Sequence, residues 1–239
     1  MDDTYSTIYE SETDFDNVLA VYDFRVFGPR VQGPRVLELG CGRGTTTKLL
    51  AEKFPALHVV DASERCIALA KGQVPASVQF FQKYFEAFEP PQRYDSIVMA
   101  HVLEHVEDPV ATLQRVQTWL APGGSIHIVV PNAHSLHRRL GVAMGLIPTL
   151  ETLDKRDLVL GHRRVYQRES LRRDVAAAGL QILHEESIFL KILTNAQLET
   201  MSAQLIEGLF KLSREFPDLC ANLYCQAAPA SPRSSSDSA

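Results

Sequence analysis

Between residues 35 and 131, short apolar segments alternate with segments of helical periodicity, and this alternation constrains the fold more than any other feature of the chain. We expect strands at 35–40, 57–63, 78–83, 94–102 and 125–131. We expect helices between them at 45–53, 64–73 and 109–124, with Ser63 and Asp108-Pro109 as helix starts. Strands that alternate with helices form βαβ units, so the pattern predicts a parallel sheet covered on both faces.

The segments outside this region are less regular. Residues 1–32 read as an N-terminal helical lid that ends where Gly33-Pro34 breaks the chain. Residues 33–228 form the main domain, and the Ser- and Pro-rich residues 229–239 read as a disordered tail. Ser170 is expected to cap a helix that ends at Gly179. Further helices are expected at 134–148, 170–178 and 195–216, and further strands at 179–190 and 220–228.

Composition narrows the class of protein. The 239 residues are 45% apolar and 22% charged, which are ordinary values for a globular chain. A net charge of −5 and a pI of about 5.9 argue against a broad basic surface, so no nucleic-acid partner is expected. No secretory signal and no apolar run of the ~20 residues that span a bilayer are found. The spacing of Cys41, Cys66, Cys220 and Cys225 fits no zinc template, so we expect free thiols in a cytoplasmic protein.

The first predicted strand runs into a glycine-rich loop, VLELGCGRG, at residues 36–44. A loop at the carboxyl end of a parallel strand is where open α/β sheets bind ligands. The dinucleotide fingerprint G-x-G-x-x-G would place its third glycine at Thr45, whereas this chain has it one residue early, at Gly44. Glu38 lies inside the strand, where a carboxylate suits a cationic ligand better than a pyrophosphate.

Here the chain resembles class I S-adenosylmethionine-dependent methyltransferases. ELGCGRG followed by VVDAS looks like their first two motifs, and YDSIVMAHVLEHVEDPV and LAPGGSIHIVVPN look like their fourth and fifth strands. GHRRVYQRESLRRDVAAAGL at 161–180 is similar to a segment of bacterial members that act on small molecules. The resemblance implies an α/β, Rossmann-like, doubly wound and mostly parallel seven-stranded sheet with a reversed last strand and helices on both faces.

The resemblance also implies which residues hold the cofactor. Gly40, Cys41 and Gly42 would let the backbone approach the methionine part of S-adenosyl-L-methionine, and Glu38 would hold its amino group directly or through water. Asp61 would accept both ribose hydroxyls, unless it only caps a helix or lies at the surface. Ala62 and Ser63 would flank the adenine.

The end of the third strand departs from the family pattern. Tyr84 and Phe85 stand where an acidic residue near the adenine is common. Their backbone groups and an aromatic ring are expected beside the adenine, and the alternative is that Phe85 and Phe88 belong to the core.

The segment HVLEH follows the fourth strand, and its spacing gathers His101, Glu104 and His105 on one face of a helical turn. Three interpretations stay open. A similar Glu-x-x-Glu-His segment in quinone-pathway catechol O-methyltransferases is linked to a divalent metal, but His101 replaces the first glutamate and hard cations prefer oxygen, so a metal is possible but not favoured. A histidine is suited to act as general base for a hydroxyl acceptor. The third interpretation is that Glu104 and His105 only orient the loop.

The acceptor is expected to contact the N-terminal lid and a substrate-cap insert near 132–165. His162 is a second base candidate or a residue that organises its loop, and His101 is expected to touch cofactor or acceptor through its position. Arg138 and Arg139 are either anion-binding or solvated. Tyr5, Tyr9, Tyr22 and Phe27 are expected to help the lid exclude water.

These features together predict an enzyme that moves a methyl group to an oxygen or nitrogen of a small-molecule acceptor such as a sugar, a quinone-like compound or a secondary metabolite. S-adenosyl-L-homocysteine would be the product, and the protein would be a monomer or homodimer without a membrane span. The alternatives are an RNA or protein methyltransferase of the same fold, a NAD(P)-dependent oxidoreductase, and a catalytically silent binding protein. AHVLEH is not the Asn/Asp-Pro-Pro-Tyr type of motif common in members that act on nucleic-acid or amide nitrogen.

Overall fold

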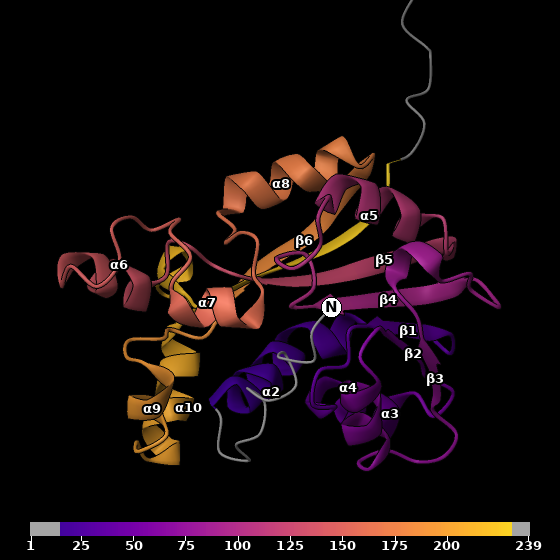
Figure 1. The fold of residues 1–239 in the computed structure, drawn as a ribbon, viewed down its shortest axis with the longest axis horizontal. Coiled ribbons are helices and arrows are strands. Elements are labelled where there is room, and N and C mark those ends of the chain that lie inside the picture. The colour runs from indigo at the N-terminus through magenta and orange to yellow at the C-terminus, as the bar shows by residue number, and fades with distance from the viewer. Residues whose placement is uncertain (1–14, 231–239) are drawn as a thin grey trace, which may run out of the picture.

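The computed structural model describes residues 15–230 and has a central sheet between two layers of helices (Figure 1). The strands are β1 Val36–Leu39, β2 His58–Asp61, β3 Gln79–Gln82, β4 Tyr94–Ala100, β5 Leu120–Pro131, β6 Leu180–Ile188 and β7 Asn222–Pro229. The α-helices are α2 Phe15–Phe27, α3 Thr45–Lys53, α4 Glu64–Lys71, α5 Pro109–Gln117, α6 Leu136–Ala143, α7 Lys155–Leu160, α8 Arg168–Ala177, α9 Asn195–Leu198 and α10 Ala203–Leu212. Short 3-10 turns cover Gly28–Arg30, Phe85–Ala87 and Pro217–Leu219.

Within residues 15–230 the strands form one seven-stranded sheet in the order β3-β2-β1-β4-β5-β7-β6. Pairing is parallel from β3 to β5, and β7 is antiparallel to both of its neighbours, β5 and β6. The predicted doubly wound sheet with a reversed last strand is therefore confirmed. The strand order reverses between β1 and β4, and ligands bind at such a switch point in open α/β sheets.

Alternating side chains along the strands enter two separate cores. Val36, Val98 and Val129 face the layer of α2, α3, α4 and α10, whereas Leu37 and Ile97 face α5 and α8. Figure 1 shows α5 and α8 on one side of the sheet and α2, α3 and α4 on the other. A sheet with both faces buried explains why the central strands read as continuous apolar runs.

Helix α2 belongs to the core and not only to a lid. Tyr22 and Phe27 are buried, and the Tyr22 ring lies 5.3 Å from Phe189 and 4.7 Å from Phe210 between centroids. The expectation that these two rings cover the acceptor is therefore wrong, because they anchor α2 against β6, β7 and α10. Tyr5 and Tyr9 lie outside the described residues.

Several predicted boundaries differ from the structure for local reasons. The helix predicted over 195–216 is interrupted, because the Ser202 hydroxyl accepts a hydrogen bond from Leu205 N and starts α10 anew. Ser170 does not precede α8: the helix begins at Arg168, and Ser170 Oγ accepts from Gln167 N inside the first turn. The helix expected over 109–124 ends at Gln117, and α6 is shorter than the predicted 134–148. Strand β7 continues through Pro229, one residue into the predicted tail.

The contact between α3 and α4 depends on Gly44, and we expect Gly44→Ala to lower the free energy of unfolding. Gly44 has φ of 93°, and a Cβ there would lie 2.7 Å from Ala70 Cα. Left-handed strain and overpacking together should cost about 2–4 kcal/mol. Urea unfolding measures this loss.

Gly123→Ala is the matched control, because Gly123 has φ of 78° and open space around the Cβ position. That variant should lose only ~1–2 kcal/mol. Equal losses in the two variants would contradict the packing role of Gly44.

Candidate functional site

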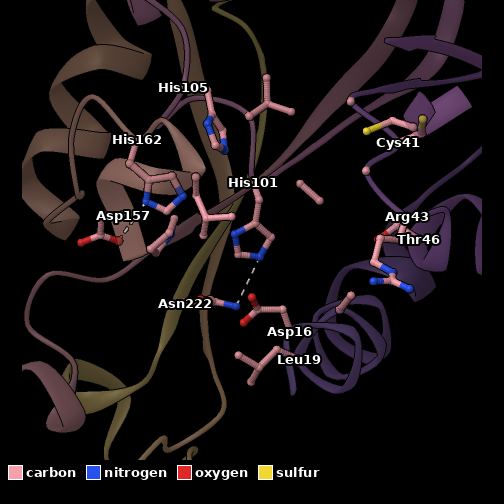
Figure 2. A pocket seen from close by; sticks show the side chains of 18 of the residues that line it. Asp16, Leu19, Cys41, Arg43, Thr46, His101, His105, Asp157, His162 and Asn222 are labelled. Carbon is pink, nitrogen blue, oxygen red and sulfur yellow. Dashed lines mark hydrogen bonds and ion pairs between the residues drawn. The ribbon is translucent and has the colours of Figure 1, made fainter. Parts of the chain in front are cut away.

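A cavity of about 1090 Å³ opens at the carboxyl edge of the sheet. Residues at the ends of all five parallel strands β1 to β5 line it: Gly40, Asp61, Gln82, Ala100 and Pro131. Figure 2 shows residues of α2 and of the glycine loop on one side of the cavity and His105, His162 and Asp157 on the other. Most of the polar side chains predicted for the site therefore lie around this cavity, at the switch point of the sheet.

The glycine loop forms the wall of the cavity next to β1. Gly40, Gly42 and Gly44 all have positive φ, at 74°, 47° and 93°. No atom lies within 4 Å of the position a Cβ would take at Gly42. The loop thus presents bare backbone to open space, as a close-approaching ligand requires.

Asp61 at the end of β2 ties this loop to the next crossover. Its Oδ2 accepts a hydrogen bond of 2.8 Å from Cys41 N, and its Oδ1 accepts one of 2.8 Å from Ser63 N. Ser63 in turn caps α4 by accepting from Cys66 N. Cys41, Asp61, Ala62 and Ser63 all line the cavity, so the two predicted cofactor motifs lie together.

Glu38, expected to hold the cofactor's amino group directly or through water, is a buried residue of β1. It is 1% exposed, lies behind the loop and is not among the residues that line the cavity. Burial, together with the nearby Asp61 carboxylate, raises the pKa of Glu38 to about 8. With this pKa, the buried carboxyl keeps its proton at neutral pH.

Tyr84 and Phe85 line the far end of the cavity beyond β3. Tyr84 is exposed and Phe85 is half-buried, whereas Phe88 is a core residue. Arg115 of α5 donates hydrogen bonds to the carbonyl oxygens of Phe85 and Phe88 and so fixes this turn. Phe85 is thus available to a ligand and Phe88 is not.

His101 lies at the centre of the cavity in a left-handed backbone conformation, with φ of 56°. Its Nε2 lies 2.9 Å from Asp23 Oδ2, and its Nδ1 lies 3.3 Å from Glu104 Oε1. Burial disfavours the charged ring, but these two carboxylates outweigh it and raise the pKa of His101 well above the usual value. Asn222 of β7 donates hydrogen bonds to both carboxylate oxygens of Asp23 and so holds Asp23 in position beside His101.

Glu104 is completely buried, and its Oε1 lies 3.3 Å from His101 Nδ1. Burial raises its pKa, but His101 and the imidazoles of His105 and His162 outweigh that effect and keep the pKa below the usual value. Ligand atoms of Glu104, His105 and His162 all lie within 4.8 Å of one another. Burial lowers the pKa of His105, so its ring is neutral near pH 7.

His162 comes from a separate segment and packs its ring edge-to-face on His105, with 4.8 Å between centroids. Its Nδ1 lies 3.0 Å from Asp157 Oδ1 (Figure 2). Arg138 is buried, donates to Asp157 Oδ2 at 3.0 Å and lines the cavity, so it is not a solvated surface residue. Arg139 is exposed, and its Nε donates to the His134 carbonyl.

Sequence reasoning missed Asp23, Asp157 and Asn222, which orient two of the predicted histidines. Asp23 and Asn222 stand more than 70 residues from His101, whereas Asp157 is five residues before His162 in a helix that was not predicted. It also missed the contacts that join the lid to the insert, where Asp16 of α2 pairs with Arg156 of α7 and accepts from Asn195 of α9. The short spacing from Asp157 to His162 was the one local signal available for these partners.

The amino-acid sequence is similar to those of known methyltransferases. A family model described as "Methyltransferase domain" matches residues 19–185. The ubiquinone biosynthesis O-methyltransferase of Azotobacter vinelandii is 32% identical over 102 residues, which are 41% of this chain and 44% of the relative. The trans-aconitate 2-methyltransferase of Variovorax paradoxus is 31% identical over 134 residues, 54% of this chain and 51% of the relative. The chain thus spans about half the length of these two curated relatives.

Solved structures share the fold at low identity. An S-adenosylmethionine-dependent methyltransferase from Mesorhizobium loti has a TM-score of 0.62 at 20% identity and covers 86% of this chain and 97% of its own. The N-methyltransferase NodS from Bradyrhizobium japonicum, in complex with S-adenosyl-L-homocysteine, has a TM-score of 0.61 at 17% identity, and the match covers 96% of this chain and 100% of NodS.

No helix within residues 15–230 is long and apolar enough to cross a membrane.

The buried carboxyl of Glu38 makes stability depend on pH. Its pKa is about 8 in the folded chain against an ordinary value of 4.5, so the folded state keeps a proton that the unfolded state releases between these values. The wild-type chain therefore loses stability as the pH rises through this interval. Glu38→Gln removes that loss and should gain up to about 3 kcal/mol over wild type at pH 7, but little at pH 4.5.

Urea unfolding of both proteins at pH 5, 7 and 8.5 measures the difference. Glu52→Gln on the exposed side of α3 is the control and should follow wild type at each pH. A Glu38→Gln variant whose stability runs parallel to wild type across the series would show that Glu38 is ionised in the folded chain.

Proposed function

The chain belongs to the methyltransferase-domain family, and from this premise we propose that it transfers a methyl group from S-adenosyl-L-methionine to an oxygen or nitrogen of a small-molecule acceptor. One observation carries the proposal. The bare backbone at Gly42 and the carboxylate of Asp61, which accepts a 2.8 Å hydrogen bond from Cys41 N, both lie at the switch point of the sheet and line a cavity large enough for cofactor and acceptor together.

The residues of the cavity fit this cofactor. The loop Gly40, Cys41 and Gly42 would receive the methionine part, and Asp61 would bind the ribose hydroxyls. Ala62 and Ser63 would flank the adenine, with Tyr84 and Phe85 at its far edge. Glu38 would support the loop from behind, because it does not reach the cavity.

The bound cofactor supplies a methyl carbon that its sulfonium sulfur already activates. The protein's contribution is then mainly to align the acceptor with that carbon, since orientation alone is worth up to ~7–11 kcal/mol. Asp16 of the lid pairs with Arg156 of the insert. This ion pair would hold the lid and the insert together on the acceptor side of the cavity and limit the access of water to it.

A hydroxyl acceptor must also lose a proton, and the histidines differ in their ability to accept it. His101 lies between two carboxylates and is an imidazolium at neutral pH, so it contributes charge and position. His105 is neutral, and His162 is held by Asp157. The base is therefore drawn from His105 and His162 rather than His101.

A small polar acceptor is favoured over a macromolecule. The ubiquinone and trans-aconitate relatives act on small molecules by their names, and the acceptor side of the cavity carries Asn132, Lys191 and Asn195. The net charge of −5 gives little support to a nucleic-acid acceptor. A NAD(P)-dependent oxidoreductase is disfavoured because Gly44 packs on Ala70 of α4 and the fingerprint position at Thr45 is not glycine.

Isothermal titration with S-adenosyl-L-methionine, S-adenosyl-L-homocysteine and NADH tests this function, together with a screen of acceptors against labelled methyl donor. We expect both sulfur nucleotides to bind and NADH not to bind. Asp61→Ala should weaken S-adenosyl-L-homocysteine binding by ~1–3 kcal/mol, because the ribose hydroxyls lose their acceptor.

Asp218→Ala is the control, because the Asp218 side chain is 84% exposed and does not line the cavity. It should bind as wild type does. NADH binding without a response to either sulfur nucleotide would overturn the proposed function, and unchanged affinity in Asp61→Ala would remove that carboxylate from the ribose site.

A further inference from the structure

Asp157 and His162 form a carboxylate–imidazole pair on the acceptor side of the cavity. We propose that Asp157 is a positioning residue that presents the Nε2 atom of His162, unprotonated, as the base that takes the acceptor's proton. The proposal rests on the proposed methyl transfer and assigns a role to Asp157 and a choice between the two base candidates.

Asp157 is fixed in place by three donors. Its Oδ1 lies 3.0 Å from His162 Nδ1, and its Oδ2 accepts from Arg138 at 3.0 Å and from Asp154 N at 3.0 Å. Burial raises the pKa of Asp157, but His162, Asp154 and Arg138 outweigh it and bring the pKa to about 2. The carboxylate is thus ionised and cannot rotate away without losing several hydrogen bonds at once.

Arg138 carries this arrangement into the insert between β5 and α8. Its guanidinium donates to the carbonyl oxygens of Leu150 and Thr152 as well as to Asp157. A planar donor fork with three acceptors on one segment sets the position of the aspartate relative to α6. The buried arginine therefore serves the pair and not an incoming anion.

Main-chain hydrogen bonds also hold His162 in place. His162 N donates to Asp157 O at 2.8 Å, where Gly161, with φ of 74°, ends α7. Arg163 N donates to Glu104 O at 2.8 Å and ties the same loop to the HVLEH segment. The ring position of His162 is thus set by Asp157 on one side and by the His105 ring on the other.

The pair determines which nitrogen carries the proton. An ionised carboxylate at Nδ1 stabilises the tautomer with the proton on Nδ1 and leaves a lone pair on Nε2. Nε2 points away from Asp157 and toward the cavity, as the view in Figure 2 shows for the second ring nitrogen. His105 is hydrogen-bonded to the main chain at Gly161, and burial lowers its pKa.

The proton transfer balances with the chemistry of the site. The acceptor's O–H or N–H proton moves to Nε2, and the electron pair it leaves forms the bond to the methyl carbon. The electron pair of the breaking carbon–sulfur bond stays on sulfur. The resulting imidazolium of His162 is stabilised by Asp157 and by the nearby buried Glu104 carboxylate.

The ring tautomer is measurable without cofactor or acceptor. In protein labelled with ¹⁵N-histidine, the His162 signals, assigned with His162→Gln, should show a protonated Nδ1 and an unprotonated Nε2 near pH 8. Asp157→Asn should reverse or mix the two forms. With an acceptor found in the labelled-methyl screen, Asp157→Asn should lower kcat by ~10²–10⁴-fold and leave the Kd for S-adenosyl-L-homocysteine within about twofold.

Asp154→Ala is the matched control for a purely structural effect. Asp154 is the other half of the capping box that starts α7, and its side chain accepts from Asp157 N. Its removal should cost ~1 kcal/mol of stability and leave the His162 tautomer unchanged. If Nδ1 of His162 loses its proton in both variants, Asp157 acts only as part of the helix cap, and the proposal is overturned.

Two further results would overturn it. One is a wild-type His162 whose Nε2 carries the proton. The other is one equivalent of zinc or manganese that survives dialysis and is lost in His162→Gln, because the metal would occupy the Nε2 lone pair. Since the tautomer is read in the free protein, a failure of cofactor binding would count against the proposed function alone.

Discussion

The reversal of strand order between β1 and β4 is the constraint on which the rest of this structure depends. It leaves a gap at the carboxyl edge into which the glycine loop, Asp61 and the HVLEH segment all project. The hydrogen bond from Cys41 N to Asp61 then joins the two crossovers on one side of that gap. All the contacts proposed for the cofactor lie along this edge of the sheet, and the residues proposed for the acceptor pack above it.

The acceptor side is assembled from segments far apart in the chain. Asp23 of α2 and Asn222 of β7 meet at His101, whereas Asp157 of α7 meets His162. The environments of His101 and His105 therefore differ within one cavity, because two carboxylates raise the pKa of His101 whereas burial lowers that of His105.

The sequence predicted those features whose cause is local. Strand positions, the Ser63 and Asp108 caps and the cofactor loop all depend on neighbours within a few residues, and the structure has them where expected. The interruption at Ser202 and the helix α7 were missed because apolar periodicity does not record a competing cap. Asp23 and Asn222 were missed as partners of His101 because they meet it only when distant segments pack together, and Asp157 was missed together with helix α7. The sequence identified Glu38 as a residue of the first strand but did not indicate that its side chain would be 1% exposed and absent from the cavity lining.

The buried acid beneath the glycine loop has a consequence for the solution around the protein. Glu38 and His101 both hold protons in the folded chain at neutral pH that they largely lack when unfolded. Folding near pH 7 therefore consumes protons from the solvent, and unfolding returns them. The apparent heat of unfolding in calorimetry should accordingly include the ionisation heat of the chosen buffer, so Tris and phosphate would give different values for the same molecule.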